Sequence, residues 1–143
     1  ELIHAIDDKQ PDLVVLAGFM RIFTPQFTHH YHGRMLNIHP SLLPQFKGIN
    51  THERAIEAEV AEHGASVHFV SSELDGGPMV LQASVSVLSL DSPKVLAARV
   101  LVQEHLIYPI AIKWFCEGRL KLQNNAVLMD GQLLPEQGIQ FQS

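Results

Sequence analysis

The stretch LNIHPSLLPQFKG, residues 36–48, carries the polar side chains best placed for chemistry. Asn37 and His39 are two residues apart and alternate with apolar Leu36 and Ile38. In a strand such residues point to the same side, so an amide and an imidazole would project together. They would offer two hydrogen-bond donors to one developing oxyanion, as acyl transfer requires. An alternative is that both side chains only bond the backbone of the following loop.

A carboxylate partner for His39 occurs in SSELDGGPMV, residues 71–80, where Asp75 precedes two glycines. A lone Asp-Gly pair is typical of a turn. If this loop folds back over Asn37 and His39, however, Asp75 would hold the imidazole protonated or oriented. The three residues would then support acyl transfer without a nucleophilic side chain. An external amine or water would have to make the attack.

Nine histidines raise the alternative of a metal site, chiefly at His29, His30 and His32. No cysteine accompanies them, and HERAI places Ile56 where an HExxH motif needs its second histidine. The pattern favours an exposed helix face, and no metal cofactor is expected. The sequence also contains no GxGxxG or GxxxxGK[ST] loop and no GxSxG elbow.

The composition argues against several classes of partner. Ten Lys and Arg residues against fifteen Asp and Glu give a net charge of −5 over 143 residues, so no broad cationic face is expected for nucleic acid. Apolar runs such as LVVLAGF are far shorter than the roughly 20 residues that span a bilayer. The single cysteine, Cys116, favours a reducing, cytoplasmic location. We therefore expect a soluble protein that binds small molecules.

The elements that must position the site follow an α/β pattern. LVVLAGF is a continuous aliphatic run, typical of a strand covered on both faces. TPQFTHHYHG begins with an N-cap and a proline and leads into the strand RMLNI, which predicts a parallel crossover unit. Ligands bind at the carboxyl ends of such strands, where Asn37 and His39 lie.

The remaining patterns predict the other elements. THERAIEAEVAEHG predicts a short helix capped by Thr51 that ends near Gly64. Residues 64–89 predict two alternating strands joined by the acidic glycine loop. Ser92 and a following proline begin the longest helix, and a late Asp-Gly pair predicts a terminal hairpin.

These motifs resemble those of the folate-dependent formyltransferases, which share an Asn-x-His followed by SLLP and a later Asp in an LDGGP-like loop. The resemblance spans nearly the whole sequence, in the order LAGFMRI, LNIHPSLLP, GINTH, HGASVHFV, ELDGGPMVLQ and QEHLIYP. GINTHERAI and HGASVHFV favour the branch of purine synthesis over the siblings that formylate initiator methionyl-tRNA or hydrolyse formylfolate.

The resemblance implies transfer of a formyl group from the co-substrate 10-formyltetrahydrofolate to the primary amine of glycinamide ribonucleotide. His39 would be the general acid, Asn37 would help to bind the oxyanion, and Asp75 would help to order a water that shuttles the proton. The residues implied for folate are Met20, Arg21, Ile22, Phe23, Asn37, Ser71, Ser72, Glu73, Leu74 and Asp75. Those implied for the glycinamide substrate are Leu101, Val102, Gln103 and Glu104, with His105 beside them. Core packing is the alternative for Met20 and Phe23.

The resemblance also implies one Rossmann-like α/β domain over residues 1–143, with a mostly parallel sheet, antiparallel additions and a long C-terminal helix. The glycine-rich phosphate-binding loop of the family has no counterpart in the sequence, and ELIHAIDDKQ reads as the later half of a helix. We therefore expect the catalytic and folate-binding portion, with an upstream phosphate-binding portion missing. Such a fragment is expected to be inactive alone and to self-associate through an exposed sheet edge.

Two alternative functions use the same residues. A formyltetrahydrofolate hydrolase would direct water at the formyl carbon. A non-catalytic folate-binding fragment would keep the pocket without turnover.

Overall fold

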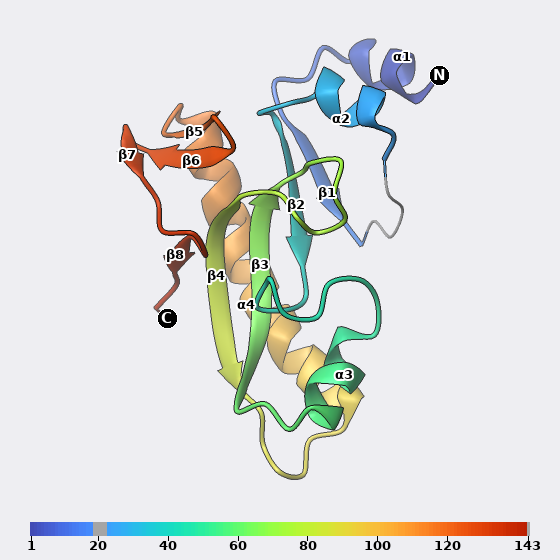
Figure 1. Ribbon diagram of the computed structural model, residues 1–143, viewed down its shortest axis with the longest axis vertical. Helices are drawn as coiled ribbons and strands as arrows, with labels where there is room; N and C mark the ends of the chain where they lie inside the picture. Colours follow the sequence, from blue (N-terminus) through green and yellow to red (C-terminus); the bar gives the residue numbers. More distant parts are fainter. Residues whose placement is uncertain (19–22, 143) are drawn as a thin grey trace.

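The computed structural model describes residues 1–18 and 23–142 and is built around a five-stranded sheet (Figure 1). The strand order is β1-β2-β3-β4-β8, parallel between β1 and β2 and between β4 and β8, and antiparallel in the two pairings between. The strands are β1 Val14–Ala17, β2 Met35–His39, β3 Glu62–Phe69, β4 Met79–Ser86 and β8 Ile139–Gln140. A smaller antiparallel sheet contains β5 Leu120–Gln123, β6 Ala126–Met129 and β7 Gln132–Leu133.

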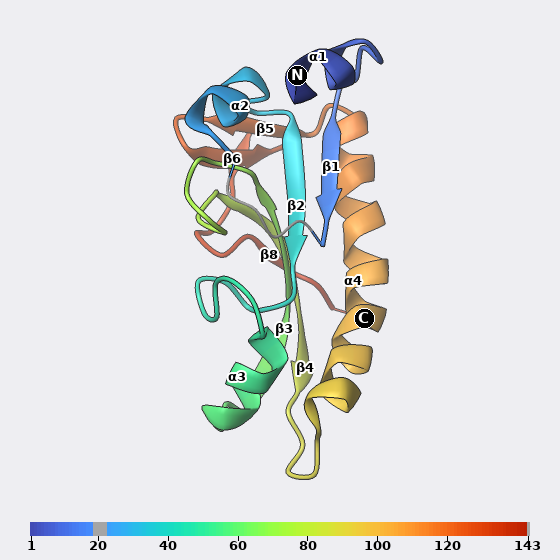
Figure 2. The same cartoon turned by 90° about the vertical axis from the view of Figure 1, so that its right-hand side faces the viewer.

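Four helices complete the described fold: α1 Leu2–Asp7, α2 Pro25–His30, α3 Thr51–Glu57 and α4 Pro93–Cys116. Figure 2 shows α4 running along one face of the large sheet, where it contacts β3 and β4. The start of α4 also contacts α3, near the lower end of the sheet in Figure 1. The α/β class and the long C-terminal helix are therefore confirmed.

Several local signals act as predicted. The side chains of Thr24 and Ser92 cap α2 and α4, accepting the backbone N–H groups of Phe27 and Val95. A proline follows each cap, where its fixed φ suits the first helical turn. The Asp-Gly pair at 130–131 joins β6 to β7 as the expected hairpin.

The boundaries predicted for α3 are wrong. Asn50, in the left-handed region with φ of 56°, is the N-cap, and the Thr51 hydroxyl instead donates to a carbonyl of the preceding loop. The helix ends at Glu57, and Gly64 lies inside β3. A Cβ on Gly64 would lie 1.9 Å from a carbonyl oxygen of β4, so this glycine permits close strand approach rather than ending a helix.

Strand β2 is buried along its whole length. Its apolar side chains divide between two clusters, one with α4 and the central strands and one with α2. The hydroxyl of Tyr108 on α4 donates to the carbonyl oxygens of Leu16 on β1 and Leu36 on β2. Burial raises the pKa of Tyr108, so the hydroxyl remains a proton donor at neutral pH. This contact ties α4 to the two strands beside the predicted site.

Helix α4 has the length and composition of a membrane-spanning helix, but one of its faces packs against β3 and β4. Its other face exposes four apolar side chains by 44–58%, Val95, Leu101, Val102 and Leu106. Among the described strands, β1 pairs only with β2, so its second edge is free, and Val15 on β1 is 42% exposed. Free strand edges and exposed apolar faces both favour association.

We therefore expect residues 1–143, produced alone, to self-associate. Sedimentation velocity should show species heavier than the 16.0 kDa monomer as concentration rises. Val15→Lys and Val102→Lys should each reduce association, because a charge on a strand edge or apolar face opposes contact. Leu90→Lys, at a position already 96% exposed in the β4–α4 loop, is the matched control and should change nothing. A single monomeric species at every concentration would contradict this expectation.

Candidate active site

The structure brings Asn37, His39 and Asp75 together. Asn37 and His39 lie among the last three residues of strand β2. They are only 8% and 6% exposed. The loop between β3 and β4 folds back over them, so that Asp75 Oδ2 lies 3.4 Å from His39 Nδ1. Asp75 has φ of 50°, a left-handed conformation that Asp tolerates better than most residues.

The loop after β2 supplies two backbone groups to this cluster. The Phe46 carbonyl oxygen lies 2.8 Å from His39 Nε2, and the Gly48 N–H donates to Asp75 Oδ2 at 2.9 Å. Both nitrogens of His39 therefore face oxygen acceptors. An imidazolium satisfies this arrangement, because each of its nitrogens carries a hydrogen.

A buried polar network fixes this loop on the sheet. Ser66 of β3 accepts the Leu43 N–H and donates to the Ser41 carbonyl. Gln82 of β4 donates to the Leu43 carbonyl and to the Ser66 hydroxyl. From the other side, Arg54 donates to two carbonyls of the loop, those of residues 47 and 49. The loop that carries the Phe46 carbonyl and the Gly48 N–H is thus held by side chains of three separate elements.

Asp75 lies between two concave regions. One is a cavity of about 490 Å³ lined by Gly18, Asn37, Ile38, His39, Pro40, Gly48, Ile49, Asn50, Thr51, His52, Glu53, Leu74, Asp75, Pro93, Ala97 and Glu104. Burial raises the pKa of Glu104, which enters this cavity from α4. The site therefore combines the β2 pair with a carboxyl group from the long helix.

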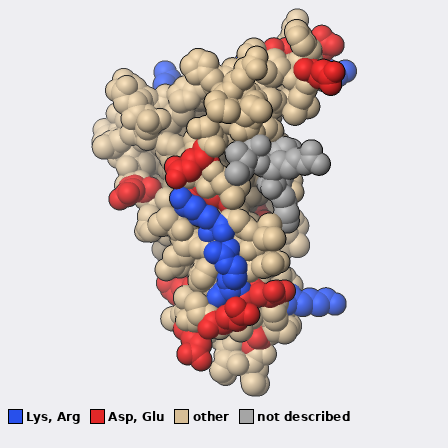
Figure 3. All heavy atoms as spheres, turned by 45° about the vertical axis from the view of Figure 1, so that its right-hand side comes forward, with Lys and Arg blue, Asp and Glu red and all other residues tan. Residues whose placement is uncertain are grey.

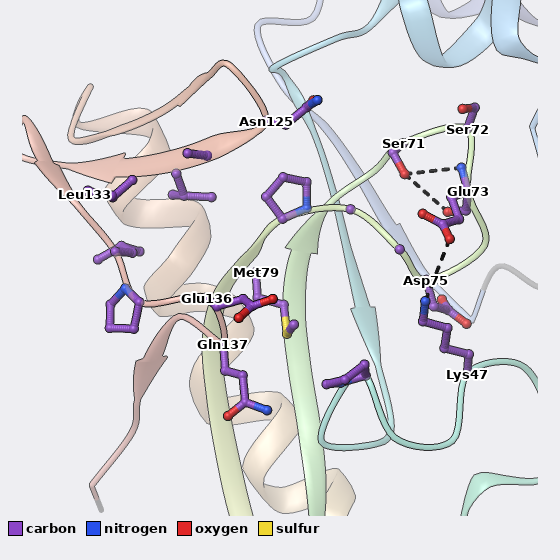
Figure 4. Close-up of a pocket in the computed structure, with 18 residues that line it drawn as sticks. Lys47, Ser71, Ser72, Glu73, Asp75, Met79, Asn125, Leu133, Glu136 and Gln137 are labelled. Atoms are coloured by element: carbon purple, nitrogen blue, oxygen red, sulfur yellow. Dashed lines mark hydrogen bonds and ion pairs between the residues drawn. The ribbon is translucent and has the colours of Figure 1, made fainter.

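The second region is an open groove of about 870 Å³ (Figure 4). Figure 4 shows Ser71, Ser72 and Glu73 on the loop above Lys47, with Asn125, Leu133, Glu136 and Gln137 facing them from the C-terminal segments. Lys47 Nζ lies 4.0 Å from the Glu73 carboxylate. The groove thus contains more acidic than basic groups.

Phe23, one of the residues implied for folate, lies in an apolar cluster with α2. Phe23 stacks on Phe27 with ring centroids 4.3 Å apart, and Val70, just before the Ser71–Asp75 loop, packs on the same cluster. Phe23 therefore packs as the core-packing alternative predicts, and its place beside a folate stays a prediction. Met20, Arg21 and Ile22 lie outside the described residues.

Of the residues implied for the glycinamide substrate, Glu104 lines the 490 Å³ cavity. Leu101 and Val102 are exposed on the apolar face of α4, Gln103 is half-buried, and His105 is exposed. None of these four lines either of the two cavities described above.

The charged surface around the site is local. Figure 3 shows Lys and Arg side chains gathered in one narrow stripe on this face, with acidic groups at both ends.

Among the described residues no group of three His, Cys, Asp or Glu side chains is arranged to hold a metal ion. Of the histidines first considered for a metal, His30 instead pairs with Asp7 at 2.8 Å.

A histidine pair borders the cavity. His52 Nδ1 lies 3.1 Å from Nε2 of His63, which is 1% exposed. Burial is the main cause that lowers the pKa of His63 to about 4, with further contributions from His52 and His39. Burial also lowers the pKa of His52. Both rings are thus kept neutral near pH 7.

Three histidines near the site were not predicted from the sequence: the half-buried His52 and the buried His63 and His68. His68 faces Asn37 across the β2–β3 ladder. Alternation in GASVHFV was a usable signal, because it places Ser66 and His68 on one face of the strand. The role of Gly77 was not predicted from the sequence either. A Cβ at Gly77 would lie 1.7 Å from the Phe69 carbonyl oxygen. Only glycine lets the loop pass that close to β3.

Comparison with known proteins places these features in a family context. Residues 1–112 match the protein family described as Formyl transferase. The phosphoribosylglycinamide formyltransferase of Escherichia coli (strain K12) is 60% identical over 138 residues, which are 96% of this chain and 65% of the relative's length. The chain thus spans just under two thirds of that relative.

Solved structures agree with the sequence comparison. The phosphoribosylglycinamide formyltransferase from Coxiella burnetii, in complex with CHES, has a TM-score of 0.95 at 50% identity, over 99% of this chain and 66% of that chain. A formyltetrahydrofolate deformylase from Pseudomonas syringae pv. tomato str. DC3000 has a TM-score of 0.84 at 30% identity, over 90% of this chain and 43% of that chain. Relatives with this fold are therefore named both as formyltransferases and as a deformylase. The fold alone does not distinguish the two reactions.

The neutral state of His63 predicts acid sensitivity. Its pKa is about 4 in the folded protein, against the ordinary histidine value of 6.5. Between these values the unfolded chain binds a proton that the folded chain does not. The free energy of unfolding should therefore be at its full value above pH 6.5 and fall by roughly 2–3 kcal/mol as the pH drops to about 4. Urea unfolding at a series of pH values measures this fall.

A His63→Phe variant provides the control, because phenylalanine retains the ring beside Phe46 and cannot titrate. Carboxyl groups that titrate in the same range contribute equally to both proteins. The difference between wild type and variant should therefore isolate His63. Identical pH dependence in both proteins would show that His63 is not held neutral.

Proposed function

Since the chain belongs to the formyl transferase family, we propose that it carries the catalytic residues for transfer of a formyl group from 10-formyltetrahydrofolate to the amine of glycinamide ribonucleotide. The observation that carries this proposal is the meeting of Asn37, His39 and Asp75 beside a cavity that Glu104 also enters. The 60% identity to a phosphoribosylglycinamide formyltransferase supports the choice of substrates.

The proposed reaction begins when the substrate amine attacks the formyl carbon on N10 of the folate. The electron pair of the C=O bond moves to oxygen, and the oxyanion accepts hydrogen bonds from Asn37 Nδ2 and His39 Nε2. For the second bond, the oxyanion takes the place that the Phe46 carbonyl oxygen occupies beside His39. Asn37 Nδ2 is already in place for this charge, whereas the His39 donor becomes available when the Phe46 carbonyl moves aside.

Collapse of the intermediate breaks the bond between the formyl carbon and N10. The amine loses one proton and N10 gains one, so the products are the formylated amine and tetrahydrofolate. His39 supplies and recovers the proton as a general acid and base, directly or through one water. Asp75 holds the Nδ1 side of the ring, and Gly48 N–H in turn holds the Asp75 carboxylate.

The proposed substrates approach from two directions. Formylfolate lies against the Ser71–Asp75 loop on the side of the Phe23 and Val70 cluster, and Met20, Arg21 and Ile22 belong to the same proposed pocket. Glycinamide ribonucleotide enters the 490 Å³ cavity, where a half-buried Glu104 suits hydroxyl or amine donors. Leu101, Val102 and Gln103 remain proposals for the outer rim of this substrate site.

Residues 1–143 are proposed to be the catalytic and folate portion of the domain. The remaining third of the relatives' length would supply the grip on the substrate phosphate. The proposed partners are small molecules, and the proposed location is the cytoplasm, which the lone exposed thiol of Cys116 supports. No resident metal belongs to the proposal.

The test is an assay of the protein at the full length of its relatives, with 10-formyltetrahydrofolate and glycinamide ribonucleotide. Formation of formylated glycinamide ribonucleotide together with tetrahydrofolate is the expected result. Release of formate without the formylated product would identify a hydrolase instead. Tight folate binding that His39→Ala leaves unchanged, without turnover of either kind, would identify a binding module.

Substitutions at the oxyanion donor and the carboxylate should lower turnover without unfolding the protein. Asn37→Ala and Asp75→Ala should each reduce kcat by about 100-fold or more, the scale for losing an oxyanion donor or an acid-base partner. Asp8→Asn, which changes the exposed carboxylate of the residue that caps the C-terminus of α1, is the matched control and should retain full activity. Steady-state kinetics and thermal melting check both effects. Near-wild-type rates with unchanged melting temperatures would assign Asn37 and Asp75 a structural role only.

A further inference from the structure

Strand β3 places a buried histidine directly against the oxyanion donor. His68 is 2% exposed and is the cross-strand partner of Asn37. It lies where the register between β3 and β4 shifts, an irregularity that redirects a side chain. The mechanism above gives this residue no role.

The hydrogen bonds of His68 define its tautomer. Nδ1 lies 2.9 Å from the Phe69 carbonyl oxygen, which can only accept, so Nδ1 carries a hydrogen. Burial, the largest effect on this ring, lowers the pKa of His68 and keeps the ring neutral. A neutral imidazole has a single N–H. Nε2 of His68 is therefore a bare acceptor.

This acceptor faces the amide of Asn37. His68 Nε2 lies 3.4 Å from Asn37 Nδ2, the single side-chain hydrogen bond of Asn37 among residues 1–18 and 23–142. Asn37 Oδ1 is buried and finds no partner in the same part of the chain. An acceptor can bind only the NH₂ end of an amide, so among the described residues His68 is the one that sets the orientation of the Asn37 amide. The second hydrogen of that NH₂ group is left for a ligand oxygen.

The same nitrogen also lies near the acid-base pair, because His68 Nε2 is 3.9 Å from Asp75 Oδ1. A charged His68 would compete with His39 for the Asp75 carboxylate. A hydrogen on Nε2 instead of Nδ1 would turn the Asn37 oxygen toward His68 and forfeit the bond to Phe69. Only the neutral ring with its hydrogen on Nδ1 avoids both effects.

We propose that His68, in the neutral form with its hydrogen on Nδ1, is a positioning residue that orients the Asn37 amide as an oxyanion donor. It thereby also leaves the Asp75 carboxylate to His39. This inference rests on the proposed function for its effect on turnover, whereas the tautomer itself can be measured without any reaction.

The first experiment measures the tautomer. Nitrogen-15 NMR of the full-length protein, labelled at histidine, should show a protonated Nδ1 and a bare Nε2 for one ring at neutral pH. That signal is assigned to His68 by its loss in His68→Gln. A hydrogen on Nε2, or a doubly protonated ring, would overturn the proposal even if the enzyme transfers formyl groups.

The second experiment separates positioning from packing. The side-chain oxygen of His68→Gln can reach the position of Nε2, whereas His68→Asn reaches only the position of Nδ1 and keeps the bond to Phe69. We expect His68→Asn to lower kcat about tenfold with little change in KM, and His68→Gln to stay within about threefold of wild type, the scale of one hydrogen bond. His32→Asn, at an exposed histidine after α2, is the matched control and should retain full activity.

A double-mutant cycle completes the test. In an Asn37→Ala background, His68→Asn should cause no further loss, because there is no amide left to orient. Equal losses from the Asn and Gln variants, or the same tenfold loss with and without Asn37, would overturn the proposal. If the Asn variant does not fold, the Gln variant and the NMR measurement remain decisive. Absence of formyl transfer in the wild type would refute the proposed function, while the NMR result would still decide the tautomer.

Discussion

The position of β2 between a parallel and an antiparallel neighbour is the constraint on which the site depends. The parallel partner β1 ends at the same edge of the sheet, which leaves that edge open to ligands. The antiparallel partner β3 sets one polar residue opposite each catalytic candidate, His68 opposite Asn37 and Ser66 opposite His39. A slip of one residue would turn each of these side chains to the other face of the sheet. The register of one buried strand therefore determines which side chains the proposed site contains.

The polar groups around this strand divide into charged and neutral roles. His39 and Asp75 form the pair that suits charge, since backbone groups of Phe46 and Gly48 complete their hydrogen bonds. The surrounding histidines are kept neutral, chiefly by burial. Neutral rings beside His39 and Asp75 supply directional acceptors without competing for the carboxylate. Several imidazoles can therefore lie in one site while Asp75 contacts His39.

Much of this arrangement follows from local sequence signals. The caps at Thr24 and Ser92 and the Asn-x-His spacing act within a few residues, so their consequences could be predicted. The pairing of His68 with Asn37 could not, because it depends on the register between strands 31 positions apart in the chain. The predicted start of α3 was wrong for a similar reason. Thr51 resembles an N-cap, but its hydroxyl donates a hydrogen bond to a carbonyl of the loop after β2. The groove in Figure 4 joins the Ser71–Asp75 loop to segments some 50 residues later, which no local pattern reveals.

Gly77 separates the exposed part of the loop over the site from the part that packs tightly on β3. A Cβ at this position would lie 1.7 Å from the Phe69 carbonyl oxygen, the same oxygen that faces His68 Nδ1. Any larger side chain at residue 77 would displace the backbone of β3, the strand that pairs with β2. By contrast, the side chains of Ser72, Glu73 and Leu74 are exposed, so other side chains fit at these positions. Substitutions at residues 72–74 therefore change the surface of the loop without moving β3, whereas a substitution at residue 77 moves β3 itself.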